Sequence, residues 1–257
     1  MRNLVRTTVL LLLPSLGVVL IGSRFGTLGF WLALIAAAAF CVYVLLRSDT
    51  VAVRAMRAYP VGEAEQPVFC RVVRESTTKA RLPMPQLYVS PTRAVNALAT
   101  GRNPNRSMIC VTEGALAVLD ENELRAVVGH ELAHIRNLDT LPASVVGAVN
   151  RLAVMVPLVG VFLAGAARLA ISRDREFKAD SESARLNGEP LALAGALRKF
   201  DAAARELVLP PEAGVVAASH LMLTSPLRYR GLLRLCRSHP STAERVARLE
   251  QLAGYRR

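Results

Sequence analysis

Two long uncharged stretches open the chain. Residues 7–23 and 25–46 contain no charged side chain. The second stretch is long enough to cross about 30 Å of hydrocarbon as a helix. No small-residue cleavage site precedes it, as a removable signal peptide would require. We therefore predict two transmembrane helices joined by a tight turn at Arg24, which together form a membrane anchor over residues 1–50.

The segment that follows mixes polar and apolar residues and is interrupted by prolines. Between residues 51 and 101 it contains short β-prone runs, VFCRVV at 68–73 and QLYVS at 86–90, and it ends with NALATG at 96–101. Residues 107–111 read as one more strand. These runs predict a small sheet.

Helical periodicity takes over at Asp120. Asp120 and Glu123 have the spacing of a capping box, and the helix they open is expected to end near Asn137. Its apolar side carries Leu124, Val127, Val128, Leu132 and Ile135. Further helices are predicted at 174–185, 191–208 and 242–253. The fold class is therefore α+β and mostly helical, with two N-terminal transmembrane helices before one domain over residues 51–257.

Composition and charge support the membrane prediction. Hydrophobic residues make up 52% of the chain and aromatic residues 5%, and the formal net charge is +12, almost all of it from arginine. Such a charge suits nucleic acid or an anionic membrane face. Because the chain has neither a recognised nucleic-acid motif nor aromatics interleaved with its basic residues, we expect a lipid bilayer and no nucleic acid as partner.

Arginines also predict the orientation of the anchor. They flank the two uncharged stretches on their outer sides at Arg2, Arg6, Arg47, Arg54 and Arg57, against Arg24 alone in the turn. By the positive-inside rule both ends of the hairpin face the cytoplasm. The four cysteines are too far apart for a disulfide framework or a cysteine metal site, which fits a reducing compartment.

Candidate chemistry lies at the end of the capped helix. His130, Glu131 and His134 form the pattern H-E-x-x-H. Two histidines one helical turn apart can bind one zinc ion, and the intervening glutamate then lies where a general base for a water at the metal is needed.

A catalytic zinc site needs a third protein ligand and an open position. Glu176 and Asp180 are spaced to share one helical face. One carboxylate could bind the metal while the other holds the far nitrogen of a ligand histidine. By spacing alone, an exposed charged helix is an equally good interpretation.

Several blocks of sequence together resemble one family. NALATGRNP, CVTEGALAVLDENELRAVVGHELAHIRN, SRDREFKADSESARLNGEPLALAGALRKF and HPSTAERVARLEQL are similar, in this order, to the HtpX-like membrane zinc metallopeptidases of gluzincin type. The resemblance implies a zincin-type protease domain that holds one zinc ion per chain. It implies His130, His134 and Glu176 as zinc ligands, Glu131 as the base, and Asp180 as the carboxylate behind a ligand.

The resemblance also implies where substrate binds. NALATG is similar to the edge strand along which such proteases hold an extended peptide, so Asn96 and Ala97 are expected beside polypeptide substrate. His239 and Arg245 match a C-terminal block expected near the site, where His239 contacts the transition state or is only structural. His220 also matches a block, without an assigned role.

The resemblance further implies a multi-pass protease of the bacterial inner membrane, with its active site facing the cytoplasm. The expected substrates are misfolded or damaged membrane proteins, and the oligomeric state is left open. An inactive membrane scaffold of the same fold and a signalling protease with one dedicated regulator are the alternatives.

One segment departs from the family pattern. Relatives place two further spans between the H-E-x-x-H helix and the third ligand, but residues 141–172 are too few for two spans of about 20 residues and a turn. The segment must return to its starting side if the site is to assemble. Either it forms a hairpin that dips into the cytoplasmic leaflet, broken at Pro157 and Gly160, or it is buried in the soluble core.

Overall fold

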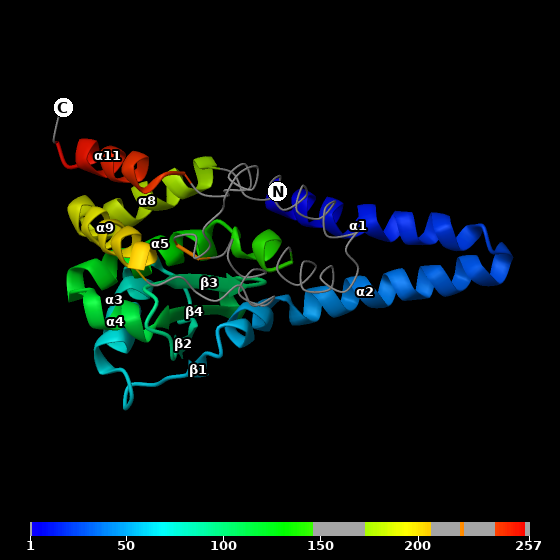
Figure 1. Ribbon diagram of the computed structural model, residues 1–257, viewed down its shortest axis with the longest axis horizontal. Coiled ribbons are helices and arrows are strands. Elements are labelled where there is room, and N and C mark those ends of the chain that lie inside the picture. Colours follow the sequence, from blue (N-terminus) through cyan, green and yellow to red (C-terminus); the bar gives the residue numbers. More distant parts are fainter. Residues whose placement is uncertain (1, 146–172, 207–221, 224–239, 255–257) are drawn as a thin grey trace.

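The computed structural model of the chain describes residues 2–145, 173–206, 222–223 and 240–254. Helices α1 (Arg2–Ser23) and α2 (Gly26–Ala55) run antiparallel and project from the rest of the molecule (Figure 1). The tight turn is confirmed, since the N–H groups of Arg24 and Phe25 donate back to the carbonyls of Ile21 and Gly22.

The apolar length of these two helices differs. Gly26–Leu46 in α2 is long and apolar enough to cross a membrane, whereas Thr7–Ser23 in α1 is a shorter apolar stretch of 17 residues. One predicted span therefore has the required length, and the second stays a prediction. Helix α2 continues through Ala55, past residue 50 where the anchor is predicted to end.

Glycines allow the two helices to meet near the turn. A Cβ on Gly22 would lie 2.7 Å from the carbonyl oxygen of Gly29, and 2.3 Å from the Cβ of Ala33. Because only a hydrogen fits there, the backbones can approach closely, as in packed helices within a bilayer.

The predicted sheet is present and has four strands in the order β1-β2-β4-β3. Strand β2 (Gln86–Ser90) pairs in parallel with β4 (Ser107–Thr112), which pairs antiparallel with β3 (Ala97–Gly101). The short β1 (Tyr59–Pro60) closes the other side. The NALATG segment therefore forms a strand at the edge of the sheet.

The VFCRVV prediction is wrong, because that run lies in helix α3 (Pro67–Ala80). Pro67 at the first helical position suits a helix start. Beyond the run, buried positions continue at helical spacing, while Arg71 and Arg74 face solvent. The amphipathic period of the whole segment thus overrides the β propensity of three valines.

Helix α5 (Glu121–Arg136) is the central element. It begins with the predicted capping box, in which Asp120 accepts from the Glu123 N–H at 2.8 Å and Glu123 accepts from the Asp120 N–H at 2.9 Å. The 3-10 helix η1 (Pro104–Arg106) leads into β4, and the short α4 (Glu113–Val118) connects β4 to α5.

The remaining described helices complete the domain around α5. They are α8 (Arg173–Asn187), α9 (Pro190–Glu206) and α11 (Thr242–Leu252). Figure 1 shows α5 between the sheet and these helices. Fully buried apolar side chains from both sides meet α5, among them Phe69, Ile109, Leu193, Leu197 and Phe200. The predicted mostly helical α+β class is confirmed for the described residues.

Residues 140–145 are helical, and the rest of the 141–172 segment lies outside the described residues. Both predictions for this segment, a hairpin that dips into the cytoplasmic leaflet and a hairpin buried in the soluble core, therefore stay untested predictions.

Candidate metal centre

Three side chains from two helices converge at one point. His130 and His134 of α5 place their Nε2 atoms 3.1 Å apart. Glu176 of α8 approaches both, with 3.8 Å between its Oε2 and His130 Nε2 and 3.5 Å between its Oε1 and His134 Nε2. All three residues are buried, and their ligand atoms lie within 4.8 Å of one another.

These separations fit a single metal ion. Two ligand atoms each about 2.0 to 2.1 Å from a tetrahedral zinc are separated by about 3.3 Å. The observed distances of 3.1, 3.5 and 3.8 Å span this value. Two imidazoles and one carboxylate are also a donor set typical of catalytic zinc, with a fourth position open.

Each histidine is held from behind by a carboxylate. His130 Nδ1 lies 3.0 Å from Asp180 Oδ1, and His134 Nδ1 lies 3.2 Å from Asp139 Oδ2. A carboxylate on Nδ1 fixes the tautomer that leaves Nε2 free to bind a metal. Such a partner is predicted at Asp180 from its spacing to Glu176, whereas Asp139, five residues after the H-E-x-x-H motif, is a second one that no sequence pattern indicates.

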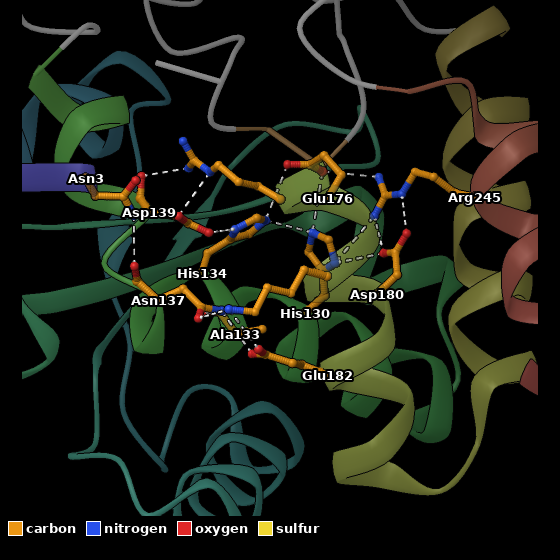
Figure 2. A network of polar contacts seen from close by, with 12 residues as sticks. Asn3, His130, Ala133, His134, Asn137, Asp139, Glu176, Asp180, Glu182 and Arg245 are labelled. Carbon is orange, nitrogen blue, oxygen red and sulfur yellow. Dashed lines mark hydrogen bonds and ion pairs between the residues drawn. The ribbon is translucent and has the colours of Figure 1, made fainter. Parts of the chain in front are cut away.

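A buried arginine backs each carboxylate in turn. Arg245 of α11 donates to Asp180 through Nε at 2.8 Å and through NH2 at 2.6 Å. Arg175 of α8 lies 3.0 Å from Asp139. Figure 2 shows the resulting network, from Asp139 through the two histidines to Asp180 and Arg245.

Electrostatics in the site follow from burial and these contacts. Burial lowers the pKa of His130 to about 4, so this imidazole is neutral, as a metal ligand must be. Burial acts to raise the pKa of Asp180, but Arg245 outweighs it and holds that pKa at about 2. Asp180 is thus ionised and can accept from His130.

Glu131 lies close to His134 and Glu176 and also reaches the edge strand of the sheet. It is 2% exposed, and it accepts a hydrogen bond from the backbone N–H of Ala99 in β3. Burial, assisted by the nearby Glu176 carboxylate, raises the pKa of Glu131 to about 7. The base predicted from the motif therefore lies between the histidine pair and the edge strand.

The outer edge of β3 already has partners inside the chain. The Ala97 carbonyl accepts from the Leu223 N–H at 2.9 Å, and the Ala97 N–H donates to the Asn96 side chain at 3.0 Å. At the other end the Gly101 N–H lies 3.4 Å from Ser144 Oγ. Ala99, at the centre, is the residue whose outward N–H meets Glu131.

Comparisons with known proteins agree with this geometry. The model of peptidase family M48 matches residues 63–253, most of the chain. The chain belongs to peptidase family M48. It is therefore a metalloprotease, a hydrolase of peptide bonds, and the resemblance seen in the sequence is confirmed.

Curated relatives of this M48 chain carry the description "Protease HtpX homolog". The one from Kineococcus radiotolerans is 50% identical over an alignment of 244 positions, which covers 84% of this chain and 83% of the relative. That from Paenarthrobacter aurescens is 42% identical, with 94% and 92% covered. That from Paraburkholderia phytofirmans is 36% identical, with 98% of each chain covered.

Most residues expected at an M48 site are brought together. His130, His134, Glu176, Asp180 and Arg245 form the network described above. Asn96 is 3% exposed and bonds its own strand. His220 and His239 lie outside the described residues.

Proposed function

We propose that this chain is a membrane-bound zinc endopeptidase that cleaves misfolded or damaged membrane proteins at the cytoplasmic face of the membrane. The observation that carries the proposal is the buried group of His130, His134 and Glu176, whose Nε2 and carboxylate atoms lie within 4.8 Å of one another. Membership in a peptidase family favours an enzyme over an inactive scaffold.

His130, His134 and Glu176 would hold the zinc ion, with Asp180 fixing His130. A zinc ion in such a site supplies a Lewis acid that polarises a peptide carbonyl and makes a water more acidic. Glu131 takes the proton of the attacking water and passes it to the leaving amide nitrogen. Its place beside the Ala99 N–H supports this role, because it puts the base next to the strand where a peptide would pair.

Substrate binding by backbone pairing supports broad selectivity. A peptide that displaces Leu223 and Ser144 from the outer edge of β3 would be held through its main chain, so its side chains would be little discriminated. Unfolded segments offer such main chain, whereas folded proteins do not. The apolar helices α1 and α2 beside the site support substrates that diffuse in the same membrane.

Glu131→Gln tests the proposal directly. Protein purified in detergent should contain one zinc ion per chain and cleave casein. The variant should keep its zinc, because residue 131 is not a ligand, and should lose about 10²-fold to 10⁴-fold in turnover. Metal analysis and a casein assay measure the two effects.

Glu121→Gln is the matched control, since Glu121 lies on the same helix but at its exposed start, where it pairs with Arg71. This control should cleave as the unmodified chain does. If Glu131→Gln cleaved casein as fast as the control, Glu131 would not be the base.

A further inference from the structure

The turn after α5 folds back on the metal centre. The helix ends at Arg136, and Leu138 adopts a left-handed conformation with φ of 55°. This reverses the chain, so that the Asp139 N–H donates to the His134 carbonyl at 2.9 Å while its carboxylate meets His134 Nδ1 at 3.2 Å. Asp139 therefore contacts His134 through both backbone and side chain.

Asp139 is itself held from two further sides. It is 5% exposed, and Arg175 approaches both its carboxylate and its backbone, at 3.0 Å and 2.9 Å. On the remaining side the amide nitrogen of Asn3 donates to Asp139 Oδ1 at 2.8 Å and to the Asn137 carbonyl at 2.9 Å. Both protons of that amide are used.

Asn3 belongs to the first turn of α1, the helix that opens the apolar hairpin. It lies 136 residues before Asp139 in the sequence. Figure 2 shows it at one end of the network, with Asp139 between it and His134. The beginning of the first apolar helix is thus two hydrogen-bonded contacts away from a histidine of the metal centre.

We propose that Asp139 is a positioning residue for His134, and that Asn3 fixes Asp139, so that docking of α1 supports the metal centre. The inference rests on the proposed function, in which His134 is a ligand. A carboxylate on Nδ1 orients the ring and makes Nε2 a better donor to a metal. Loss of either Asp139 or Asn3 should therefore weaken metal binding without removing a ligand.

The test uses the full chain in detergent, loaded with Co²⁺ or Zn²⁺. Metal affinity is measured by competition with a chromogenic chelator, and the ligand field by the visible absorption of bound Co²⁺. We expect Asp139→Asn to lose about 10-fold to 100-fold in affinity and to shift the Co²⁺ bands. Asn3→Leu, which removes one support of Asp139, should lose about twofold to tenfold.

Matched controls separate positioning from general damage. Asp201→Asn makes the same charge change in an exposed pair with Arg205, and Ser15→Ala removes a polar group from α1 that contacts Leu11 and Cys41 instead of the metal centre. Both should bind metal as the unmodified chain does. Thermal unfolding identifies variants that fail to fold, and Asp139→Asn is preferred to alanine because it retains an oxygen beside His134 and Arg175.

The outcomes are distinguishable. Unchanged affinity and Co²⁺ spectrum in Asp139→Asn would overturn the inference while leaving the zinc peptidase intact. A loss in Asp139→Asn with none in Asn3→Leu would overturn the part played by α1 alone. Failure of the unmodified chain to bind either metal would overturn the proposed function, and the inference with it.

Discussion

Arg245 connects several parts of the site. Its guanidinium is 2% exposed and donates to both oxygens of Asp180 and to the Leu223 carbonyl. It also lies 3.6 Å from Glu176. Forming a buried ion pair costs desolvation energy. Removing one partner from a pair that has formed is strongly destabilising, because the other charge then stays buried without a partner.

Arg245→Ala should therefore be severely destabilising. It leaves the Asp180 carboxylate buried and ionised, which costs about 3–5 kcal/mol of unfolding free energy. Arg205→Ala is the control, because Arg205 pairs with Asp201 on the surface with 77% of its side chain exposed, and such pairs contribute about 1 kcal/mol or less. Denaturant unfolding in detergent measures both. Equal losses in the two variants would contradict the structural role assigned to Arg245.

At the scale of elements, the metal centre depends on how closely α8 approaches α5. A Cβ on Gly129, the residue before His130, would lie 2.8 Å from Ser183 Oγ and 2.6 Å from Asn187 Nδ2. Ser183 in turn donates to the Ala126 carbonyl at 2.6 Å. Side chains of α8 thus lie directly against the backbone of α5 at Gly129, and we infer that this close approach helps to place Glu176 near the histidines.

Gly129→Ala should push the helices apart. Overpacking of this kind costs about 1–3 kcal/mol, and metal affinity should fall as Glu176 moves away from His130 and His134. Gly17→Ala is the control, since no other side chain or backbone lies within 4 Å of a Cβ there, and alanine is the better helix former. Chelator competition and thermal unfolding report the two effects. Full metal affinity in Gly129→Ala would show that the interface can relax without disturbing the ligands.

The elements also show why some features could be predicted and others could not. The capping box and the i, i+4 histidines are local patterns, so both the limits of α5 and the pairing of His130 with His134 follow from sequence. The β-prone run at 68–73 misled because its short-range composition competes with a longer helical period. Asp139 and Asn3 could not be found, since their contact requires a left-handed residue and the docking of a helix 136 residues away.

At the scale of the whole molecule, the tip of the hairpin is remote from the metal centre. Figure 1 shows the turn between α1 and α2 at one extreme of the molecule, with the sheet and α5 at the other. Large apolar side chains are exposed along both helices, among them Leu12, Leu16, Trp31, Leu32 and Ile35. A soluble protein rarely exposes so continuous an apolar surface. The exposed side chains therefore support contact of the hairpin with lipid.

If the hairpin crosses the membrane, its tip and the peptidase domain face opposite sides. Ser23 at the tip and Thr78 on α3 are both exposed and both bond a backbone carbonyl of their own helix, so cysteine can replace either with similar local effects. The native cysteines Cys41, Cys70, Cys110 and Cys236 are first replaced by alanine.

In spheroplasts, a membrane-impermeant maleimide should label Ser23→Cys at once and Thr78→Cys only after permeabilisation. This follows from the arginines that flank the hairpin on its other ends, which are retained on the cytoplasmic side. If Ser23→Cys were labelled only after permeabilisation, α1 and α2 would lie along the cytoplasmic face of the membrane or dip into it. The 17-residue apolar stretch of α1 would then be too short to span the bilayer.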